Sequence, residues 1–126
     1  MSNEPVRTIS GKVHYLERIA LAPNSKLYVS LQDVSVSDVP GKLLDQQVIP
    51  DAGTAGLNFN LTYRVADVVP GHRYAISAQI KHDDKLIFVT TQHHPVILDA
   101  AYLAPQEVLV HAYDERPRGT RNPDRP

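Results

Sequence analysis

Apolar and polar residues alternate strictly along residues 57–63. Successive side chains of a β-strand point to opposite faces, so this pattern predicts a strand with one buried and one solvated face. The predicted buried set is Leu57, Phe59, Leu61 and Tyr63. Residues 26–34 repeat the alternation with Leu27, Val29 and Leu31. Strands of this kind are typical of antiparallel sheets.

Turn-forming residues divide the chain into further short apolar runs. Pro70-Gly71 and other segments rich in proline, glycine and asparagine mark the divisions. Gln46 and Gln47 interrupt one run, which favours an edge position for that strand. The predicted strands are residues 8–16, 26–34, 43–49, 57–63, 73–82, 85–92 and 108–113. We therefore expect an all-β fold, an antiparallel β-sandwich of about seven to eight strands.

The chain has 126 residues, enough for one domain with a hydrophobic core. We expect a flexible N-terminus at residues 1–7 and a β-sandwich domain at residues 8–113. Within that domain we expect a short helical turn at residues 98–103. Residues 114–126 are rich in Pro, Arg, Asp and Gly, and this composition predicts a disordered C-terminal tail.

The segment from residue 73 to residue 92 predicts a hairpin with Asp83-Asp84 as its two-residue turn. In that register His82 faces Lys85, Ile80 faces Ile87, Ala78 faces Val89 and Tyr74 faces His93. The predicted core face is Ile76, Ala78, Ile80, Ile87 and Val89. A second apolar spot then lies on the opposite face. It contains Leu86 and Phe88 beside Lys81 and Gln79, and we predict these four residues as a partner-binding surface.

Composition excludes several classes of function. The net charge of −1 gives no global field that would recruit nucleic acid. The sequence contains no cysteine, which excludes disulfides, thiol nucleophiles and a lipid-modified cysteine within it. The opening residues Met1 to Pro5 show no basic run before an apolar core, so no signal peptide is expected. No apolar run approaches the roughly 20 residues of a transmembrane helix.

The six histidines predict no metal site. His93 and His94 are adjacent, so on a strand they point to opposite faces, and His82 with Asp83 and Asp84 would bind a divalent ion only weakly at a hairpin tip. Four aspartates flank turns, where they bond the local backbone: Asp33, Asp38, Asp45 and Asp51. The serines lack a Gly-x-Ser-x-Gly motif. We predict no catalytic, cofactor-binding or metal-binding residues and no enzyme activity.

The order of several segments resembles a known family. These segments are Ile9-Ser-Gly-Lys-Val-His-Tyr15, Glu17-Arg-Ile-Ala-Leu21 with Pro23, Leu27-Tyr-Val-Ser-Leu-Gln-Asp-Val34, Phe59-Asn-Leu-Thr-Tyr63, Arg73-Tyr-Ala-Ile-Ser-Ala78 and Asp83-Asp-Lys-Leu-Ile-Phe-Val-Thr90. Together they resemble the YbaY and YscW family of small bacterial lipoprotein domains, over roughly residues 8–98, and the chain is closer to YbaY. The family's lipid-bearing cysteine is missing here, and Asp84 stands where relatives usually have glycine.

The resemblance implies a β-sandwich without catalysis. YscW-like members are pilotins, lipid-anchored periplasmic chaperones that carry a secretin subunit to the outer membrane. It implies a location on the periplasmic face of the bacterial envelope, or in the cytoplasm if the chain is naturally leaderless. The expected partner is an outer-membrane or secretion-system protein. We expect a monomer that binds no nucleic acid and no cofactor.

Our leading hypothesis is a non-enzymatic envelope module that captures a segment of a partner protein. The edge strand at residues 43–49 would accept a partner strand, or the surface around Leu86 and Phe88 would accept an amphipathic helix, which we prefer. The alternative for that surface is that residues 98–113 cover it.

A different class remains open, a small-molecule or glycan-binding β-sandwich module. It would use Tyr28, Tyr63, Tyr74 and Tyr102, and would require several of these rings to line one pocket. A hydrolase would require a cleft in which His and Asp converge.

Overall fold

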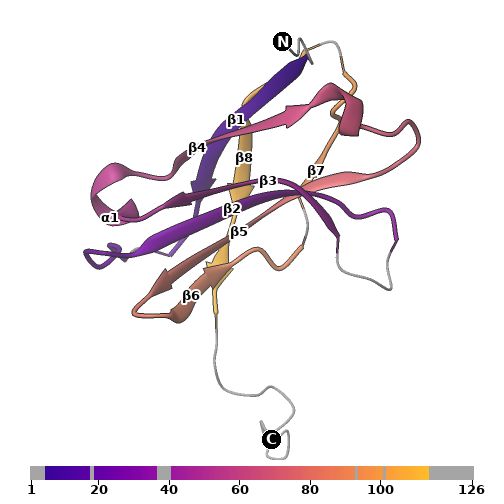
Figure 1. Ribbon diagram of the computed structural model, residues 1–126. Coiled ribbons are helices and arrows are strands. Elements are labelled where there is room, and N and C mark those ends of the chain that lie inside the picture. Colours follow the sequence, from indigo (N-terminus) through magenta and orange to yellow (C-terminus); the bar gives the residue numbers. More distant parts are fainter. Residues whose placement is uncertain (1–4, 18, 37–40, 93, 101, 114–126) are drawn as a thin grey trace, which may run out of the picture.

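The computed structural model describes residues 5–17, 19–36, 41–92, 94–100 and 102–113. These residues form two facing sheets with little helix (Figure 1). The elements are β1 (Val6–His14), β2 (Lys26–Asp33), β3 (Lys42–Ile49), α1 (Ala52–Ala55), β4 (Asn58–Arg64), η1 (Val65–Asp67), β5 (Tyr74–His82), β6 (Lys85–Val89), β7 (His94–Val96), β8 (Gln106–Leu109) and β9 (His111–Ala112). The predicted all-β, two-sheet fold is confirmed.

One sheet has the strand order β4-β1-β8. β1 and β4 run antiparallel with Ile9 opposite Leu61, so both side chains enter the core. β8 runs parallel to β1, which the expectation of an antiparallel sandwich did not include. Gly11 lies where β8 crosses close to β1. A Cβ at this position would overlap the carbonyl oxygen of Gln106, so the close approach of the two strands requires glycine here.

The other sheet has the order β3-β2-β5-β6-β9, and β7 also pairs with β5. β2 and β5 form its centre, where Leu27 faces Ile80 and Leu31 faces Ile76. All four of these side chains are fully buried. β3 is the terminal strand of this sheet, so the predicted edge position of residues 43–49 is confirmed.

The two sheets are joined differently along their two sides. On one side, the buried residue Val110 leads the chain from β8 into β9, and therefore from one sheet into the other. On the other side, β3 and β4 lie beside each other (Figure 1), bridged by side chains. The carboxylate of Asp45 accepts the N–H of Thr62 at 2.7 Å, and the amide oxygen of Gln47 accepts the N–H of Asn60 at 2.7 Å. These bonds satisfy amides on the outer edge of β4.

The β5–β6 hairpin confirms part of the predicted register and corrects the rest. Asp83 and Asp84 form the predicted turn, with φ of 52° and 64°, and His82 pairs with Lys85. The register then shifts by one residue, so that Ile80 faces Phe88 rather than Ile87. A bulge of this kind opposes two residues of one strand to one of its neighbour.

The bulge reverses the predicted faces of two residues. Phe88 is fully buried and its ring stacks on Tyr15 with centroids 4.5 Å apart. Val89 lies opposite Gln79 on the outer face, whereas Ile87 is half-buried and packs against the core. The prediction that Val89 lies on the core face and Phe88 outside it is therefore wrong, and the core contact predicted for Ile87 is partial. Burial of the aromatic ring removes more apolar area from water than burial of an aliphatic side chain would.

Three further predictions are only partly matched. Tyr74 lies opposite Val96 of β7, and its predicted partner His93 lies outside the described residues. In the short helical turn predicted at residues 98–103, residues 98 and 99 form a turn in which the Ala100 N–H donates to the carbonyl oxygen of Ile97. β1 begins at Val6, within the stretch expected to be flexible. The remaining predicted N-terminal residues 1–4, the residues around Asp38 and Pro40, and the predicted tail at 114–126 also lie outside the described part of the chain.

Candidate binding site

An apolar pocket with a volume of about 390 Å³ opens at the end of the sandwich where β2 ends and β5 begins. We refer to it as the apolar pocket. Its aliphatic lining residues are Val34, Val68, Val69, Val96, Ile97 and Leu98, together with Pro95. Two of these side chains remain open to solvent, since Ile97 is 71% exposed and Val69 is 43% exposed. Apolar side chains left exposed around a concavity are typical of a binding surface.

One wall of the apolar pocket follows β7. β7 pairs with the first residues of β5, so that Val96 lies opposite Tyr74. Beyond β7 the backbone is held by side chains from the other sheet. The guanidinium of Arg7 donates to the carbonyl oxygens of Leu98 at 3.1 Å and of Ala100 at 2.8 Å. The buried hydroxyl of Tyr63 also donates to Leu98, at 3.1 Å, and burial raises the pKa of this phenol.

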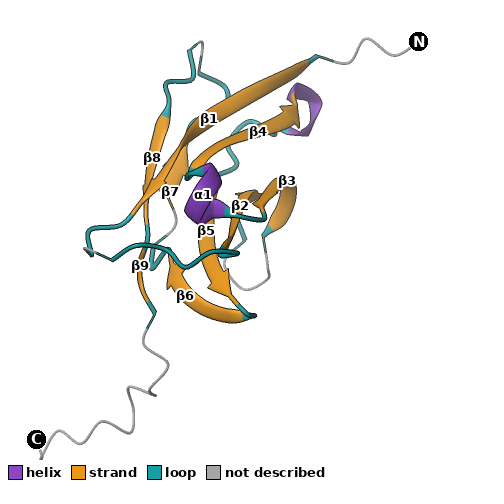
Figure 2. Ribbon diagram, turned by 90° about the vertical axis from the view of Figure 1, so that its left-hand side faces the viewer, coloured by secondary structure: helices purple, strands orange, loops and turns teal. Residues whose placement is uncertain are grey.

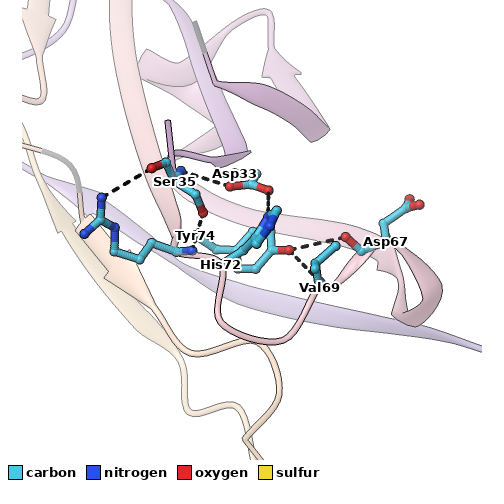
Figure 3. Close-up of polar contacts among 7 residues, drawn as sticks. Asp33, Ser35, Asp67, Val69, His72 and Tyr74 are labelled. Atoms are coloured by element: carbon cyan, nitrogen blue, oxygen red, sulfur yellow. Dashed lines mark hydrogen bonds and ion pairs between the residues drawn. The ribbon is translucent and has the colours of Figure 1, made fainter. Parts of the chain in front are cut away.

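The opposite wall is the loop between η1 and β5, held by Tyr74. The Tyr74 hydroxyl accepts the N–H of Val69 at 2.7 Å and donates to the carbonyl oxygen of Asp67 at 3.4 Å (Figure 3). Gly71 has a φ of 87°, a left-handed conformation that glycine adopts without steric cost. This geometry fixes the position of Val69 at the mouth of the pocket.

A polar network joins β2 to the start of β5 beside the mouth (Figure 3). His72 Nδ1 donates to Asp33 Oδ2 at 2.6 Å, and the other oxygen of Asp33 accepts the N–H of Ser35 at 3.0 Å. The hydrogen bond from His72, which is the largest cause, and the bonds from Ser35 together lower the pKa of Asp33 from 3.8 to about 2. Ser35 Oγ accepts the N–H of Arg73 at 2.7 Å, which ties the strand ends together a second time.

His72 and Asp33 resemble two members of a hydrolytic triad, so the position of a nucleophile matters. Within the described residues, the nearby hydroxyl of Ser35 bonds to the backbone of Arg73 and not to the ring of His72. A triad requires the nucleophile to bond to the base. The network therefore supports a role in positioning the two strand ends.

The four residues predicted as a partner-binding surface are only partly brought together. Lys81 and Leu86 are cross-strand partners on the outer face of the β2–β5–β6 sheet, and exposed Gln79 lies on the same face. Phe88 points into the core instead. None of the four lines the apolar pocket. A binding role for Gln79, Lys81 and Leu86 stays a prediction, whereas Phe88 is not available as an exposed anchor.

The sequence interpretation did not select the residues of the apolar pocket. A signal for them exists in two aliphatic runs that lie next to prolines, Val68-Val69-Pro70 and Pro95-Val-Ile-Leu98. Both runs fall largely outside the strands with clear alternation. In each run one aliphatic side chain is exposed, Val69 and Ile97, whereas Val68, Val96 and Leu98 pack in or against the core.

The tyrosines do not converge on one pocket. Tyr63 is buried in the core and Tyr102 is an exposed surface residue. Tyr74 lines the apolar pocket, whereas Tyr28 lines a different pocket near the opposite end of β2. The condition for the predicted glycan-binding module is therefore not met.

The described residues contain neither a cluster suited to a metal ion nor a helix suited to crossing a membrane. No group of three or more His, Cys, Asp or Glu side chains is placed to hold a metal ion in this part of the chain. His82 Nε2 does lie 3.4 Å from the carboxylate of Asp83 at the hairpin tip. No helix among the described segments has the length and apolar character needed to cross a bilayer.

Comparisons with known proteins agree with the fold. A family model described as the type III secretion system lipoprotein chaperone YscW matches residues 4–105. The uncharacterized lipoprotein YbaY of Escherichia coli strain K12 is 39% identical over 90 residues, which cover 71% of this chain and 47% of YbaY. The chain thus spans about half the length of that relative.

A solved structure is also similar. It is an alternative pilotin from the type II secretion system of Vibrio cholerae, with a TM-score of 0.78 and 35% sequence identity. The match covers 87% of this chain and 99% of the pilotin chain. The family model, the lipoprotein relative and the pilotin structure agree, and the chain belongs to the YscW family of secretion-system lipoprotein chaperones.

Proposed function

We propose that this domain is a non-enzymatic chaperone module that captures a segment of an outer-membrane or secretion-system protein, as a pilotin captures a secretin. Two findings support the proposal: the match to a lipoprotein chaperone family and the similarity to a type II secretion pilotin. Both relatives point to the bacterial envelope, so we propose that the domain acts on its periplasmic face.

The apolar pocket is the proposed capture site, and its exposed aliphatic lining is the observation that carries this assignment. Its volume of about 390 Å³ accommodates two or three apolar side chains of a partner segment. Exposed Ile97 and Val69 would lose contact with water when such side chains enter. An amphipathic partner segment fits this site, because its apolar face would fill the pocket and its polar face would meet His72, Arg73 and Asp99 at the rim.

A second capture mode would use the outer edge of β3. β3 is the terminal strand of its sheet, and its exposed residues include Leu43 and Val48. A partner strand that pairs with its backbone would have to displace β4, which lies beside this edge and is bonded to Asp45 and Gln47. We favour the apolar pocket, because it offers a concave apolar surface that no neighbouring strand of the described chain covers.

The test is a pull-down with two double variants matched for exposure. Ile97→Ser with Val69→Ser alters the apolar pocket, where these residues are 71% and 43% exposed. Leu16→Ser with Ile19→Ser alters residues of similar exposure outside both proposed capture sites, at 72% and 53%. Both variants should keep the fold, as checked by circular dichroism and thermal unfolding.

The bait is incubated with envelope and cytosolic fractions of the native host, and captured proteins are identified by mass spectrometry. We expect an outer-membrane or secretion-system protein to bind the wild type and the control variant. Its capture should fall about tenfold or more with the pocket variant. Capture of cytosolic proteins alone would argue against the proposed role, and equal capture by both variants would argue against the apolar pocket as its site.

A further inference from the structure

A second pocket, of about 240 Å³, lies at the opposite end of β2 and β5, and we refer to it as the charged pocket. Its lining residues are Asn24, Lys26, Tyr28, Lys81, Asp83 and Asp84. It opens on the outer face of the sheet, away from the core. β2 rises about 3.3 Å per residue from Lys26 to Asp33, so roughly 23 Å separates the two ends of the strand. The charged pocket and the apolar pocket can therefore be occupied at the same time.

Two lysines on neighbouring strands lie side by side in the charged pocket. Lys26 and Lys81 are directly opposite cross-strand partners, an arrangement in which like charges destabilise the sheet. No described carboxylate forms an ion pair with either ammonium group. Lys81 Nζ instead lies 5.4 Å from the centre of the Tyr28 ring. The pair is thus a local concentration of positive charge without a direct ion-pair partner among the described residues.

Two carboxylates lie in the same pocket without pairing with the lysines. Asp83 and Asp84 come from the β5–β6 turn, and Asn24 comes from the loop before β2. These three are the only described residues other than glycine with a positive φ. Asn and Asp tolerate this conformation, which a two-residue hairpin turn requires. The lining of the pocket combines two ammonium groups, two carboxylates and one aromatic ring.

We propose that the charged pocket binds a phosphoethanolamine group. The phosphate would lie between Lys26 and Lys81, because its several terminal oxygens can accept from two ammonium groups at once. The ligand ammonium would face Asp83 and Asp84, and its short methylene link would rest against Tyr28. A simple anion would be repelled by the aspartates and a simple cation by the lysines, so the divided charge favours a zwitterion.

Solution NMR titration tests the assignment with defined probes. Glycerophosphoethanolamine should shift the backbone amides of residues 24–28 and 81–84, and should bind about fivefold more tightly than diethyl phosphate, a phosphodiester with the same phosphate charge that lacks the ammonium group. Lys26→Gln with Lys81→Gln should abolish binding of both probes. Asp83→Asn with Asp84→Asn should remove only the preference for glycerophosphoethanolamine. Lys12→Gln, an exposed lysine on the other sheet, is the matched control and should change neither.

Vesicles distinguish a lipid headgroup from a free ligand. Flotation with phosphatidylethanolamine vesicles, but not with pure phosphatidylcholine vesicles, would assign the group to a lipid. Titration of the free probe without flotation would assign the pocket to a soluble phosphoethanolamine compound. No shift at the lining residues, or equal affinity for diethyl phosphate, would overturn the proposal. The lysine variant should leave capture at the apolar pocket unchanged, so this proposal and the proposed function fail independently.

Discussion

His72 Nδ1 lies 2.6 Å from Asp33 Oδ2 and fastens the end of β2 to the loop that leads into β5 beside the apolar pocket. The side chain of Asp33 is only 14% exposed, whereas that of His72 is 42% exposed. The carboxylate is therefore the shielded member of the pair, and its charged form is stabilised by the donors around it.

The depressed pKa of Asp33 predicts how stability depends on pH. Its pKa falls from 3.8 to about 2 in the folded protein, so the folded state favours the ionised carboxylate. This contribution is complete above pH 4 and is lost as the pH falls from about 4 towards 2. The imidazole of His72 is exposed to solvent, which screens its interaction with Asp33. We therefore expect Asp33→Asn to lower the free energy of unfolding by about 1 kcal/mol at neutral pH.

Urea unfolding at pH 7, 4 and 2.5 measures this effect. The difference in unfolding free energy between the wild type and Asp33→Asn should become smaller between pH 4 and pH 2.5. A difference that stays constant down to pH 2.5 would show that the ionised carboxylate is not what stabilises the network.

The bulge in β6 predicts very different effects for neighbouring substitutions. Phe88 is fully buried against Tyr15, so Phe88→Ala should lower the free energy of unfolding by about 3–5 kcal/mol. Leu86 is half-buried on the outer face, so Leu86→Ser should cost about 1 kcal/mol or less. Chemical unfolding of the two single variants measures both values. Similar losses would mean that the two side chains have equal burial, against the observed register.

The sequence predicts the structure correctly in strands that have one apolar and one polar face. The alternation along residues 57–63 and in β2 predicts the observed buried faces, because in both strands one face is apolar and the other polar. The Asp83-Asp84 turn is also predicted, since two residues between complementary strands suffice. The run from Lys85 to Val89 has apolar residues on both faces, so alternation alone does not fix its register.

The contacts that form the candidate site are long-range and leave no periodic pattern. Arg7 reaches Leu98 across 91 positions of sequence, and Asp33 reaches His72 across 39. The parallel pairing of β8 with β1 depends on the path of the whole chain. The apolar pocket is therefore a product of topology, and its residues were recognisable in sequence only as aliphatic runs beside prolines.

The junction between β3 and β4 gives a prediction about self-association. Asp45 and Gln47 satisfy the backbone amides of Thr62 and Asn60, which lie on the outer edge of β4. Asp45→Ala with Gln47→Ala should expose these amides, lower the free energy of unfolding by about 2 kcal/mol, and promote edge-to-edge association.

Hydrogen exchange and light scattering provide the measurements. Exchange at Asn60 and Thr62 should become faster in the double variant, and oligomers should form as its concentration rises. Gln46→Ala is the control, because Gln46 lies on β3 but bonds to Ser30 on β2. Unchanged exchange at Asn60 and Thr62 would show that the two side chains do not protect this edge.

The hydroxyl of Tyr63 predicts a link between the core and the apolar pocket. It donates to Leu98 from a buried position, and Arg7 donates to the same carbonyl oxygen. Tyr63→Phe removes one of the two donors and keeps the ring in the core. We expect a loss of about 1 kcal/mol in stability, with most of the change confined to the wall formed by residues 96–100.

Hydrogen exchange should therefore become faster at Leu98 and Ala100 in Tyr63→Phe, while amides in β2 and β5 stay protected. Affinity for a partner captured at the apolar pocket should fall by about threefold to fivefold, because a looser wall must be ordered on binding. Tyr102→Phe, at an exposed tyrosine, is the control and should change neither quantity. Unchanged exchange at Leu98 and Ala100 would mean that the hydroxyl does not hold this wall, whereas faster exchange with full capture would mean that the wall at Leu98 is not part of the capture site.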